Sequence, residues 1–284
     1  MLKYESCILK FFSILVVEPC HKMAQSNKDS NNCVQSKPKA LILLADGAEE
    51  MEVVITADVL RRGGIDVTLA SFFESSFEKG ENENPNNRPI ICSRDVRIMP
   101  DKSLQEAMMQ HNESNEPGQS KAASYDIIVI PGGMQGAKTL AGSMKIGQIL
   151  KRQEAEALGL LNNPNIIDKD PTIDHVHQQK ENDKGEIGRN KYLAAICAGP
   201  LAFLAHGIGR GRRITSHPSV KDRFTSASDL YTYIDNEDVV VDGPFITSRG
   251  PGTTFSFALT IVKELQSKKV ADSIIEPMML KQKS

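Results

Sequence analysis

The sequence predicts an α/β fold in which a mostly parallel β-sheet is covered by helices on both faces. From residue 39 onward, short runs of β-branched and other apolar residues alternate with segments of helical periodicity. These runs are apolar throughout, as expected of strands that are buried on both faces. Hydrophobic residues make up 40% of the 284 residues, which is enough for a core without disulfides.

The first half of the chain supplies strands and helices in alternation. The first helix is predicted because Met51, Ile55 and Val59 share one face, and Gly63-Gly64 ends it. In chain order, the predicted elements are Lys39–Ala45 (strand), Glu49–Arg62 (helix), Ile65–Ala70 (strand), Ile90–Cys92 with Val96–Met99 (hairpin or edge pair), Lys102–Met109 (short helix), Tyr125–Ile130 (strand) and Gly136–Leu158 (one long helix).

The second half continues the same order. A proline at position 277 predicts a kink in the last helix. The predicted elements are Tyr192–Ile196 (strand), Leu201–Ala205 (helix), Val239–Val241 and Phe245–Ser248 (strands), Thr253–Leu265 (helix) and Val270–Leu280 (final helix).

One domain, residues 38–284, is predicted after a polar extension of residues 1–37 that is expected to be disordered. Three polar stretches at 74–88, 111–121 and 162–190 are expected to be surface insertions. The apolar run of residues 7–17 resembles a signal-peptide core, but Lys10 interrupts it and no cleavage site follows clearly. It is too short to span a membrane, and Met23 is an alternative start.

Charge and cysteine content restrict the partners. The formal net charge of −2 implies no general attraction to nucleic acid or anionic membranes. The five cysteines, at 7, 20, 33, 92 and 197, form neither a zinc motif nor a disulfide framework. We therefore expect a reducing compartment, the cytoplasm and also the nucleus or mitochondrion, and a protein that needs neither cofactor nor metal.

Cys197 is the candidate nucleophile. It follows an apolar strand and precedes Ala198, Gly199 and Pro200, which allow a sharp turn into a helix. A thiol on such an elbow faces a helix N-terminus, which favours the thiolate near neutral pH. A buried structural cysteine is the alternative, and this segment alone does not decide between the two.

Two further loops follow predicted strands. The first, Ala45 to Glu52, carries several carboxylates, most simply solvated helix caps. Glu52 is the exception, because a protonated carboxyl there could donate a hydrogen bond to the Cys197 thiolate. The second, Pro131 to Gly136, contains Gly132 and Gly133 and is a candidate oxyanion hole. It lacks the pattern of a nucleotide-binding loop.

Three more side chains are candidates. His217, in a Thr-Ser-His-Pro segment, is either a proton carrier or an ordinary surface residue. Arg94 and Arg249 either orient an anionic substrate or pair with carboxylates; for Arg94 these are Asp95 or a glutamate of the first helix.

Taken together, these segments resemble the Parkinsonism-associated deglycase group of the DJ/PfpI superfamily. The matching motifs, in order, are ADGAEEME (45–52), CSRDV (92–96), YDIIVIPGG (125–133), AAICAGP (194–200), SHP (216–218) and TSRGPGT (247–253). The resemblance covers residues 38–284 and implies a flavodoxin-like three-layer sandwich with a nucleophile elbow. It also implies Cys197 as nucleophile and redox-sensitive thiol, Glu52 as protonated carboxyl, Gly133 and Ala198 as amide donors, and His217 as an auxiliary residue. Gly132 and Arg94 are the further expected binding residues.

The resemblance implies a cofactor-independent enzyme that converts methylglyoxal or glyoxal, and their early adducts, to lactate or glycolate. The alternative is a redox-sensing, chaperone-like protein whose Cys197 is oxidised to a sulfinate. Family members are typically homodimers with the first helix in the contact, so a homodimer is expected. Ala198 replaces the histidine that follows the cysteine in the protease-like branch, so peptidase activity is not expected.

Overall fold

A seven-stranded sheet lies at the centre of the described residues, which in the computed structural model are 36–73, 88–109, 123–160 and 190–281. Every neighbouring pair of strands is parallel except the first two at one edge. The order across the sheet is β10 (Val239–Asp242), β11 (Phe245–Ser248), β7 (Tyr192–Ile196), β6 (Ile127–Ile130), β1 (Lys39–Leu44), β2 (Asp66–Ser71) and β5 (Lys102–Ser103). The predicted mostly parallel sheet is confirmed.

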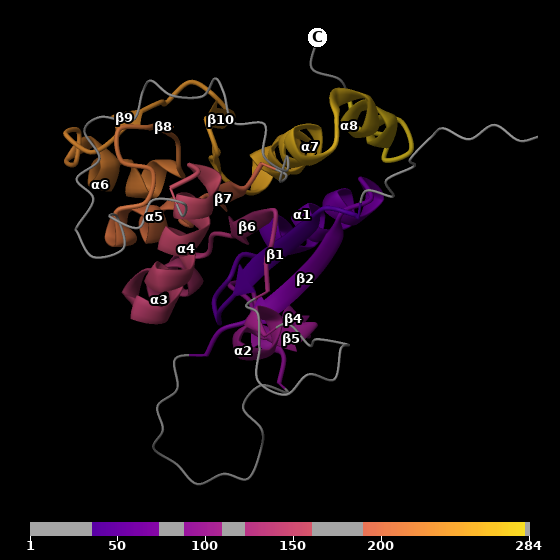
Figure 1. Cartoon of the computed structure of the whole chain (residues 1–284), viewed down its shortest axis with the longest axis horizontal. Coiled ribbons are helices and arrows are strands. Elements are labelled where there is room, and N and C mark those ends of the chain that lie inside the picture. The colour runs from indigo at the N-terminus through magenta and orange to yellow at the C-terminus, as the bar shows by residue number, and fades with distance from the viewer. Residues whose placement is uncertain (1–35, 74–87, 110–122, 161–189, 282–284) are drawn as a thin grey trace, which may run out of the picture. The chain divides into compact units, whose positions relative to one another are not determined.

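The core has two halves, one on each face of the sheet. On β1, Ala40, Ile42 and Leu44 point into one apolar cluster, and Leu41 and Leu43 point into the other. The first cluster is covered by α1 (Glu50–Arg62), α7 (Thr254–Leu265) and α8 (Lys268–Ile275), and the second by α3 (Met134–Gly142), α4 (Met144–Ala157) and α5 (Pro200–His206). Figure 1 shows these two groups of helices on opposite sides of the strands. This is the three-layer sandwich that the sequence predicted.

The prediction of a single long helix over 136–158 is wrong, because Ser143 interrupts the helix and separates α3 from α4. Ser143 is extended, with φ −90° and ψ 119°, and its hydroxyl accepts a hydrogen bond from the Ile146 N–H at 3.3 Å. A serine side chain competes with the helical backbone for such hydrogen bonds and so favours a helix start.

Ser143→Ala should therefore lower the free energy of unfolding by about 1 kcal/mol, because α4 loses its N-cap hydrogen bond. Urea unfolding followed by circular dichroism measures this change. Ser226→Ala is the control, since Ser226 is exposed at the end of α6 (Lys221–Thr225) and caps no helix start. Equal stability of the two variants would contradict the role assigned to Ser143.

Several short elements differ from the prediction. The segment predicted as the helix 102–109 begins with β5 and continues as α2 (Leu104–Met108), which a Ser103–Glu106 capping box starts. Pro277 follows α8 rather than kinking it. The predicted hairpin is confirmed as β3 (Ile90–Ile91) and β4 (Arg97–Ile98). The elements that were not predicted are β8 (Arg213–Ile214), β9 (Thr232–Tyr233), α6, and the 3-10 helices η1 (Pro218–Val220) and η2 (Pro251–Thr253).

The extension 1–37 and the insertions 74–88, 111–121 and 162–190 lie outside the described residues, apart from positions 36, 37, 88 and 190. By its contacts, Lys37–Ser284 forms a compact unit of its own. Within the described ranges, no helix is both long and apolar enough to cross a membrane.

Candidate active site

The predicted site residues lie at the carboxyl ends of three adjacent strands. Glu52 follows β1, Gly132 and Gly133 follow β6, and Cys197 follows β7, and these strands are neighbours in the order β7-β6-β1. The chain runs from β1 outward to β2 and then returns to β6 on the other side of β1. Sites in open α/β sheets form at such a switch point, outside the carboxyl ends of the strands.

Cys197 sits on a strained turn between β7 and α5. Its φ is +62°, a left-handed conformation that non-glycine residues rarely adopt. The turn is held by hydrogen bonds, since the Cys197 N–H donates to the Ser248 carbonyl at 3.0 Å and its own carbonyl accepts from the His217 N–H at 2.9 Å. At Gly199, a Cβ would lie 2.4 Å from the Ile130 carbonyl oxygen, so only glycine fits. The predicted nucleophile elbow is confirmed.

Glu52 lies beside the thiol, buried to 1% exposure in the first turn of α1. Its Oε2 accepts a hydrogen bond from the Gly132 N–H at 2.6 Å, while Oε1 is buried without an ordinary hydrogen bond among the described residues. Burial raises the pKa of Glu52 to about 8, the charge of Glu49 adds to this, and the Gly132 and Cys197 hydrogen bonds oppose it. A carboxyl with such a pKa keeps its proton at neutral pH, as the sequence analysis expected.

Two backbone amides also reach the sulfur. The N–H groups of Gly133 and Ala198 are hydrogen-bonded to Cys197 and lower its pKa. Gly132 lets the loop come this close, because a Cβ there would lie 2.5 Å from the Cβ of Cys197 and 2.6 Å from Glu52 Oε2. The structure therefore brings together five of the predicted residues, Cys197, Glu52, Gly132, Gly133 and Ala198.

Two features of the site oppose the low thiol pKa that the elbow motif predicts. Burial and then the Glu52 carboxylate raise the pKa of Cys197 to about 12, which outweighs the two amides. The helix behind the elbow, α5, has only seven residues, so its dipole contributes little. When Glu52 carries the proton instead, its negative charge is absent, and burial is what still opposes the two amides. The two groups thus share protons as a pair.

His217 lies next to the elbow through its backbone rather than its ring. Its N–H holds the Cys197 carbonyl, whereas its Nδ1 lies 2.8 Å from the Ser219 hydroxyl and accepts from the Ser219 N–H at 3.1 Å. Among the described residues, no hydrogen bond joins the imidazole to Cys197 or Glu52. The sequence placed His217 in the right loop but gave no sign that its ring caps η1.

The two candidate arginines differ. Arg94 is exposed between β3 and β4, donates to the Ser93 carbonyl at 2.9 Å and makes no ion pair within the described ranges. The suggested pairing with Asp95 or a first-helix glutamate is therefore not seen. Arg249 pairs with Asp235, at 3.6 Å between Nη2 and Oδ1. Within the described part of the chain, Arg249 is therefore held in an ion pair and Arg94 is not.

Ser248 and Thr253 shape the loop beside the elbow, and neither was predicted as a site residue. The Ser248 carbonyl holds the Cys197 N–H, and the Ser248 and Thr253 hydroxyls are 2.7 Å apart. The Thr253 hydroxyl also accepts the Gly250 N–H at 3.1 Å. The sequence signal for them was their position at the end of or after β11, the last parallel strand, which pairs with β7.

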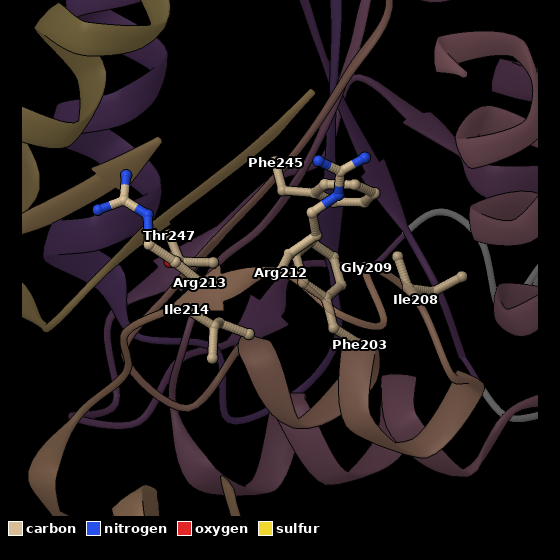
Figure 2. A pocket seen from close by; sticks show the side chains of 8 residues that line it. All are labelled: Phe203, Ile208, Gly209, Arg212, Arg213, Ile214, Phe245 and Thr247. Carbon is tan, nitrogen blue, oxygen red and sulfur yellow. The ribbon is translucent and has the colours of Figure 1, made fainter. Parts of the chain in front are cut away.

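A small pocket, too narrow to admit a water molecule, lies away from these residues. Figure 2 shows its lining, with the Arg212 guanidinium over the Phe245 ring. The two groups are 5.9 Å apart, and Arg212 also pairs with Asp242 at 3.4 Å. None of the predicted site residues lines this pocket, so it is not the candidate active site. Nor does the described part of the chain contain a cluster of three or more residues suited to a metal ion.

The described residues that flank two of the insertions lie near the amino ends of the strands, opposite the candidate site. Gln153 on α4 donates through Nε2 to the carbonyls of Tyr125 and Tyr192, just before or at the start of β6 and β7. The Ala123 N–H likewise donates to the Met108 carbonyl at 3.0 Å. The described residues that flank 110–122 and 161–189 therefore lie near the amino ends of the strands, whereas Cys197 lies at the carboxyl ends.

Comparison with known proteins gives consistent results. The profile of the DJ-1/PfpI family matches residues 38–158 and 177–264. The chain is 38% identical to Drosophila melanogaster protein DJ-1alpha over 263 residues, covering 93% of this chain and 92% of that protein. It is 40% identical to the Danio rerio Parkinson disease protein 7 homolog over 86% of this chain and 97% of that protein.

Two further relatives are informative. A Caenorhabditis elegans protein named glutathione-independent glyoxalase DJR-1.2 is 36% identical over 86% of this chain and 98% of its own length. The crystal structure of Drosophila melanogaster DJ-1beta aligns with a TM-score of 0.63 and 32% identity, over 87% of this chain and all of that chain. The resemblance found in the motifs is thereby confirmed at the level of the family, and this chain belongs to the DJ-1/PfpI family.

Proposed function

We propose that this protein is a cysteine-dependent glyoxalase that uses no cofactor and acts on methylglyoxal and glyoxal. The observation that carries the proposal is the placement of Cys197 between the Glu52 carboxyl and the N–H groups of Gly133 and Ala198. This arrangement offers a nucleophile, a proton store and amide donors at one point. The C. elegans relative's name as a glyoxalase supports the same chemistry.

The proposed reaction begins when the Cys197 thiolate adds to the aldehyde carbon of methylglyoxal. The carbonyl oxygen becomes an oxyanion, which the Gly133 and Ala198 amides stabilise until it takes a proton from Glu52. The hemithioacetal carbon then loses its hydrogen as a proton and the ketone oxygen takes up a proton, which gives an enediol. The neighbouring carbon next gains a proton while the hydroxyl on the sulfur-bearing carbon loses its own, which yields a lactoyl thioester. Water cleaves the thioester to lactate and the free thiol, so the net reaction adds one water molecule to methylglyoxal.

Glu52 is suited to move these protons because its raised pKa of about 8 lies near the working pH. His217 is the second candidate carrier; its backbone N–H is bonded to the elbow, and the Nδ1 of its ring is engaged by Ser219. Early adducts of the same aldehydes with amines and thiols present the same carbon to Cys197. We therefore extend the proposal to protein deglycation and to a role in the response to oxidative stress.

The purified protein is tested with methylglyoxal in the absence of glutathione and added metal. Lactate formation equal to the methylglyoxal consumed is the expected result. Failure to form lactate above the buffer rate, with Cys197 still alkylated by iodoacetamide, would refute the glyoxalase proposal.

The second candidate function is that of a redox sensor. Two amides and the Glu52 carboxyl surround the half-buried sulfur, and the same groups would hydrogen-bond the oxygens of a Cys197 sulfinate. Mild peroxide should then add two oxygen atoms to Cys197 alone, which peptide mass spectrometry detects. Oxidation spread evenly over the cysteines would argue against this function.

Arg94 is the cation we assign to substrate binding. It is exposed and without an ion pair in the described part of the chain, and it lies next to Ser93, whose N–H donates to the Ala48 carbonyl at 2.8 Å. Aldehydes that carry a carboxylate, such as glyoxylate, are the substrates for which its charge should matter most.

A homodimer is proposed from an exposed apolar surface on α1 and the β3–β4 hairpin. Met51 and Val54 on α1 are 50% and 53% exposed, and Ile91 and Val96 on the hairpin are also exposed. The Ser93 hydroxyl donates to Glu50 Oε2 at 2.9 Å, which holds the hairpin beside the start of α1. Apolar side chains gathered in this way favour contact with a second copy.

Val54→Glu should weaken the dimer at least about tenfold, because a charge would be buried in the contact. Analytical ultracentrifugation over a concentration series measures the dissociation constant. Met144→Glu is the control, since Met144 is exposed on α4, on the other face of the sheet. A Val54→Glu protein that stays as dimeric as the control would refute this interface.

A further inference from the structure

Asp46, at the carboxyl end of β1, is held by an arginine from a distant part of the chain. Arg88 donates to both oxygens of its carboxylate, with distances of 3.2 Å to Oδ1 and 2.6 Å to Oδ2. The Ile91 N–H also donates to Oδ1, at 3.0 Å. The Arg88 guanidinium lies 4.0 Å from the centre of the Phe73 ring. We name Asp46, Arg88 and Phe73 the clasp.

The clasp is only partly exposed, with side-chain exposures of 44% for Arg88 and 32% for Asp46. Burial disfavours the charge of Asp46, but the hydrogen bonds from Arg88 and Ile91 and the charge of Arg88 outweigh it and lower the pKa of Asp46. A two-point contact between a guanidinium and a carboxylate fixes direction as well as distance. The clasp therefore holds residues 88–91 in one position against the end of β1.

The same two segments are joined by backbone hydrogen bonds. The Gly47 N–H donates to the Ile91 carbonyl at 2.7 Å, and the Ser93 N–H donates to the Ala48 carbonyl at 2.8 Å. With the bond from Ile91 to Asp46, the loop Asp46–Ala48 is attached to residues 91–93 at three points. The side chain of Asp46 acts here as an additional acceptor in an otherwise backbone pairing.

The loop that contains Asp46–Ala48 also packs against Gly132 and Gly133 of the active site. The Glu49 N–H donates to the Gly132 carbonyl at 3.0 Å. A Cβ at Gly133 would lie 2.0 Å from the Gly47 carbonyl oxygen, so the two loops touch without space between them. Any shift of Gly47–Glu49 must therefore move Gly132 and Gly133, whose N–H groups reach Glu52 and Cys197.

We propose that Asp46 and Arg88 are positioning residues, which hold the loop Gly47–Glu49 against Gly132–Gly133 and so fix the amides at Cys197. The clasp touches neither the thiol nor Glu52, and it acts through the two loops. Its effect on turnover rests on the proposed glyoxalase function, whereas its effect on the reactivity of Cys197 does not. Small displacements of groups that stabilise a transition state are costly, so the effect should appear in kcat.

The test compares Asp46→Asn, Arg88→Gln and the double variant with the wild-type protein. Two quantities are measured, namely kcat and KM for methylglyoxal and the rate of alkylation of Cys197 by iodoacetamide, followed on its own peptide. We expect kcat and the alkylation rate to fall roughly three- to tenfold in each single variant, with KM little changed. The double variant should be no worse than the more affected single variant, because both remove the same contact.

The control is Asp58→Asn, which breaks the exposed pair of Asp58 and Arg62 (2.8 Å) at the other end of α1. It should leave both quantities unchanged, as should Arg62→Gln. Unchanged alkylation in the clasp variants would overturn the proposal, as would losses that add in the double variant or that the control shares. Should Asp46→Asn fail to fold, Arg88→Lys keeps the charge, loses the two-point contact and decides the question.

The alkylation rate separates this proposal from the proposed function. A wild-type protein with no turnover would refute the glyoxalase function. The alkylation rates of the clasp variants would then still decide whether the clasp positions the amides.

Discussion

Cys197→Ala should abolish the turnover of methylglyoxal, with kcat/KM lower on the order of a thousandfold or more. The sulfur is the atom that forms the bond to the aldehyde carbon, and neither Glu52 nor the amides of Gly133 and Ala198 can replace it. The fold should survive, since alanine tolerates the turn nearly as well and the neighbours of Cys197 are small. Lactate assays at equal protein concentration measure the loss, with circular dichroism as the check of folding.

Cys92→Ala is the matched control. Cys92 is buried at 4% exposure, and burial together with the charges of Glu50, Glu49 and Asp46 raises its pKa, with no amide hydrogen bonds from the described residues to its sulfur like those that Cys197 receives. Its replacement should leave kcat/KM within about twofold of wild type. Equal turnover in Cys197→Ala and wild type would refute the nucleophile assignment.

The second large effect is expected for Gly132→Ala. The added methyl group would lie 2.5 Å from the Cβ of Cys197 and 2.9 Å from its sulfur, so the thiol, Glu52 or the loop must move. We expect a loss in kcat of about a hundredfold, with a loss of about 1–3 kcal/mol in stability. The hydrogen bond from the Gly132 N–H to Glu52 would be disturbed at the same time.

Gly142→Ala provides the comparison, because nothing lies within 4 Å of a Cβ at the end of α3. This variant should keep its activity and gain up to about 1 kcal/mol of stability, as alanine favours the helix. Steady-state kinetics and urea unfolding of both variants measure the two effects. Normal activity in Gly132→Ala would show that the close packing of the loop is not needed.

The buried strands were the most predictable part of the fold. A run such as Leu41–Leu44 is apolar on both faces, so its side chains are all buried only in the middle of a covered sheet. The elbow was predictable for a similar reason, because a strand that runs directly into small residues and a proline has few other conformations. The break at Ser143 was not, since a serine is tolerated inside helices and only the N-cap geometry shows that it ends one.

The site was predicted in its composition but not in its electrostatics. Order along the chain placed Glu52, Gly133 and Cys197 at one edge of the sheet. The degree of burial, which dominates the pKa of both Glu52 and Cys197, depends on packing from distant segments and has no local signature. The orientation of the His217 ring and the pairing of Asp46 with Arg88 are likewise contacts between side chains that no spacing rule specifies.

In the proposed mechanism Glu52 holds a proton while Cys197 is a thiolate, and the pH dependence of Cys197 alkylation tests this pairing. With Cys197 neutral, Glu52 has a pKa of about 8, so the pairing requires the thiol to lose its proton at or below that pH. Otherwise Glu52 ionises first and its charge raises the pKa of Cys197 to about 12.

The measurement compares the wild-type protein with Glu52→Gln, using iodoacetamide and the Cys197 peptide from pH 5 to 11. We expect the midpoint of the alkylation rate against pH to lie at or below about pH 8 in the wild-type protein. It should be higher in Glu52→Gln, because an amide is a weaker hydrogen-bond donor than a carboxylic acid. A wild-type midpoint well above 8, falling when Glu52 becomes glutamine, would show that Glu52 suppresses the thiolate and would contradict the account.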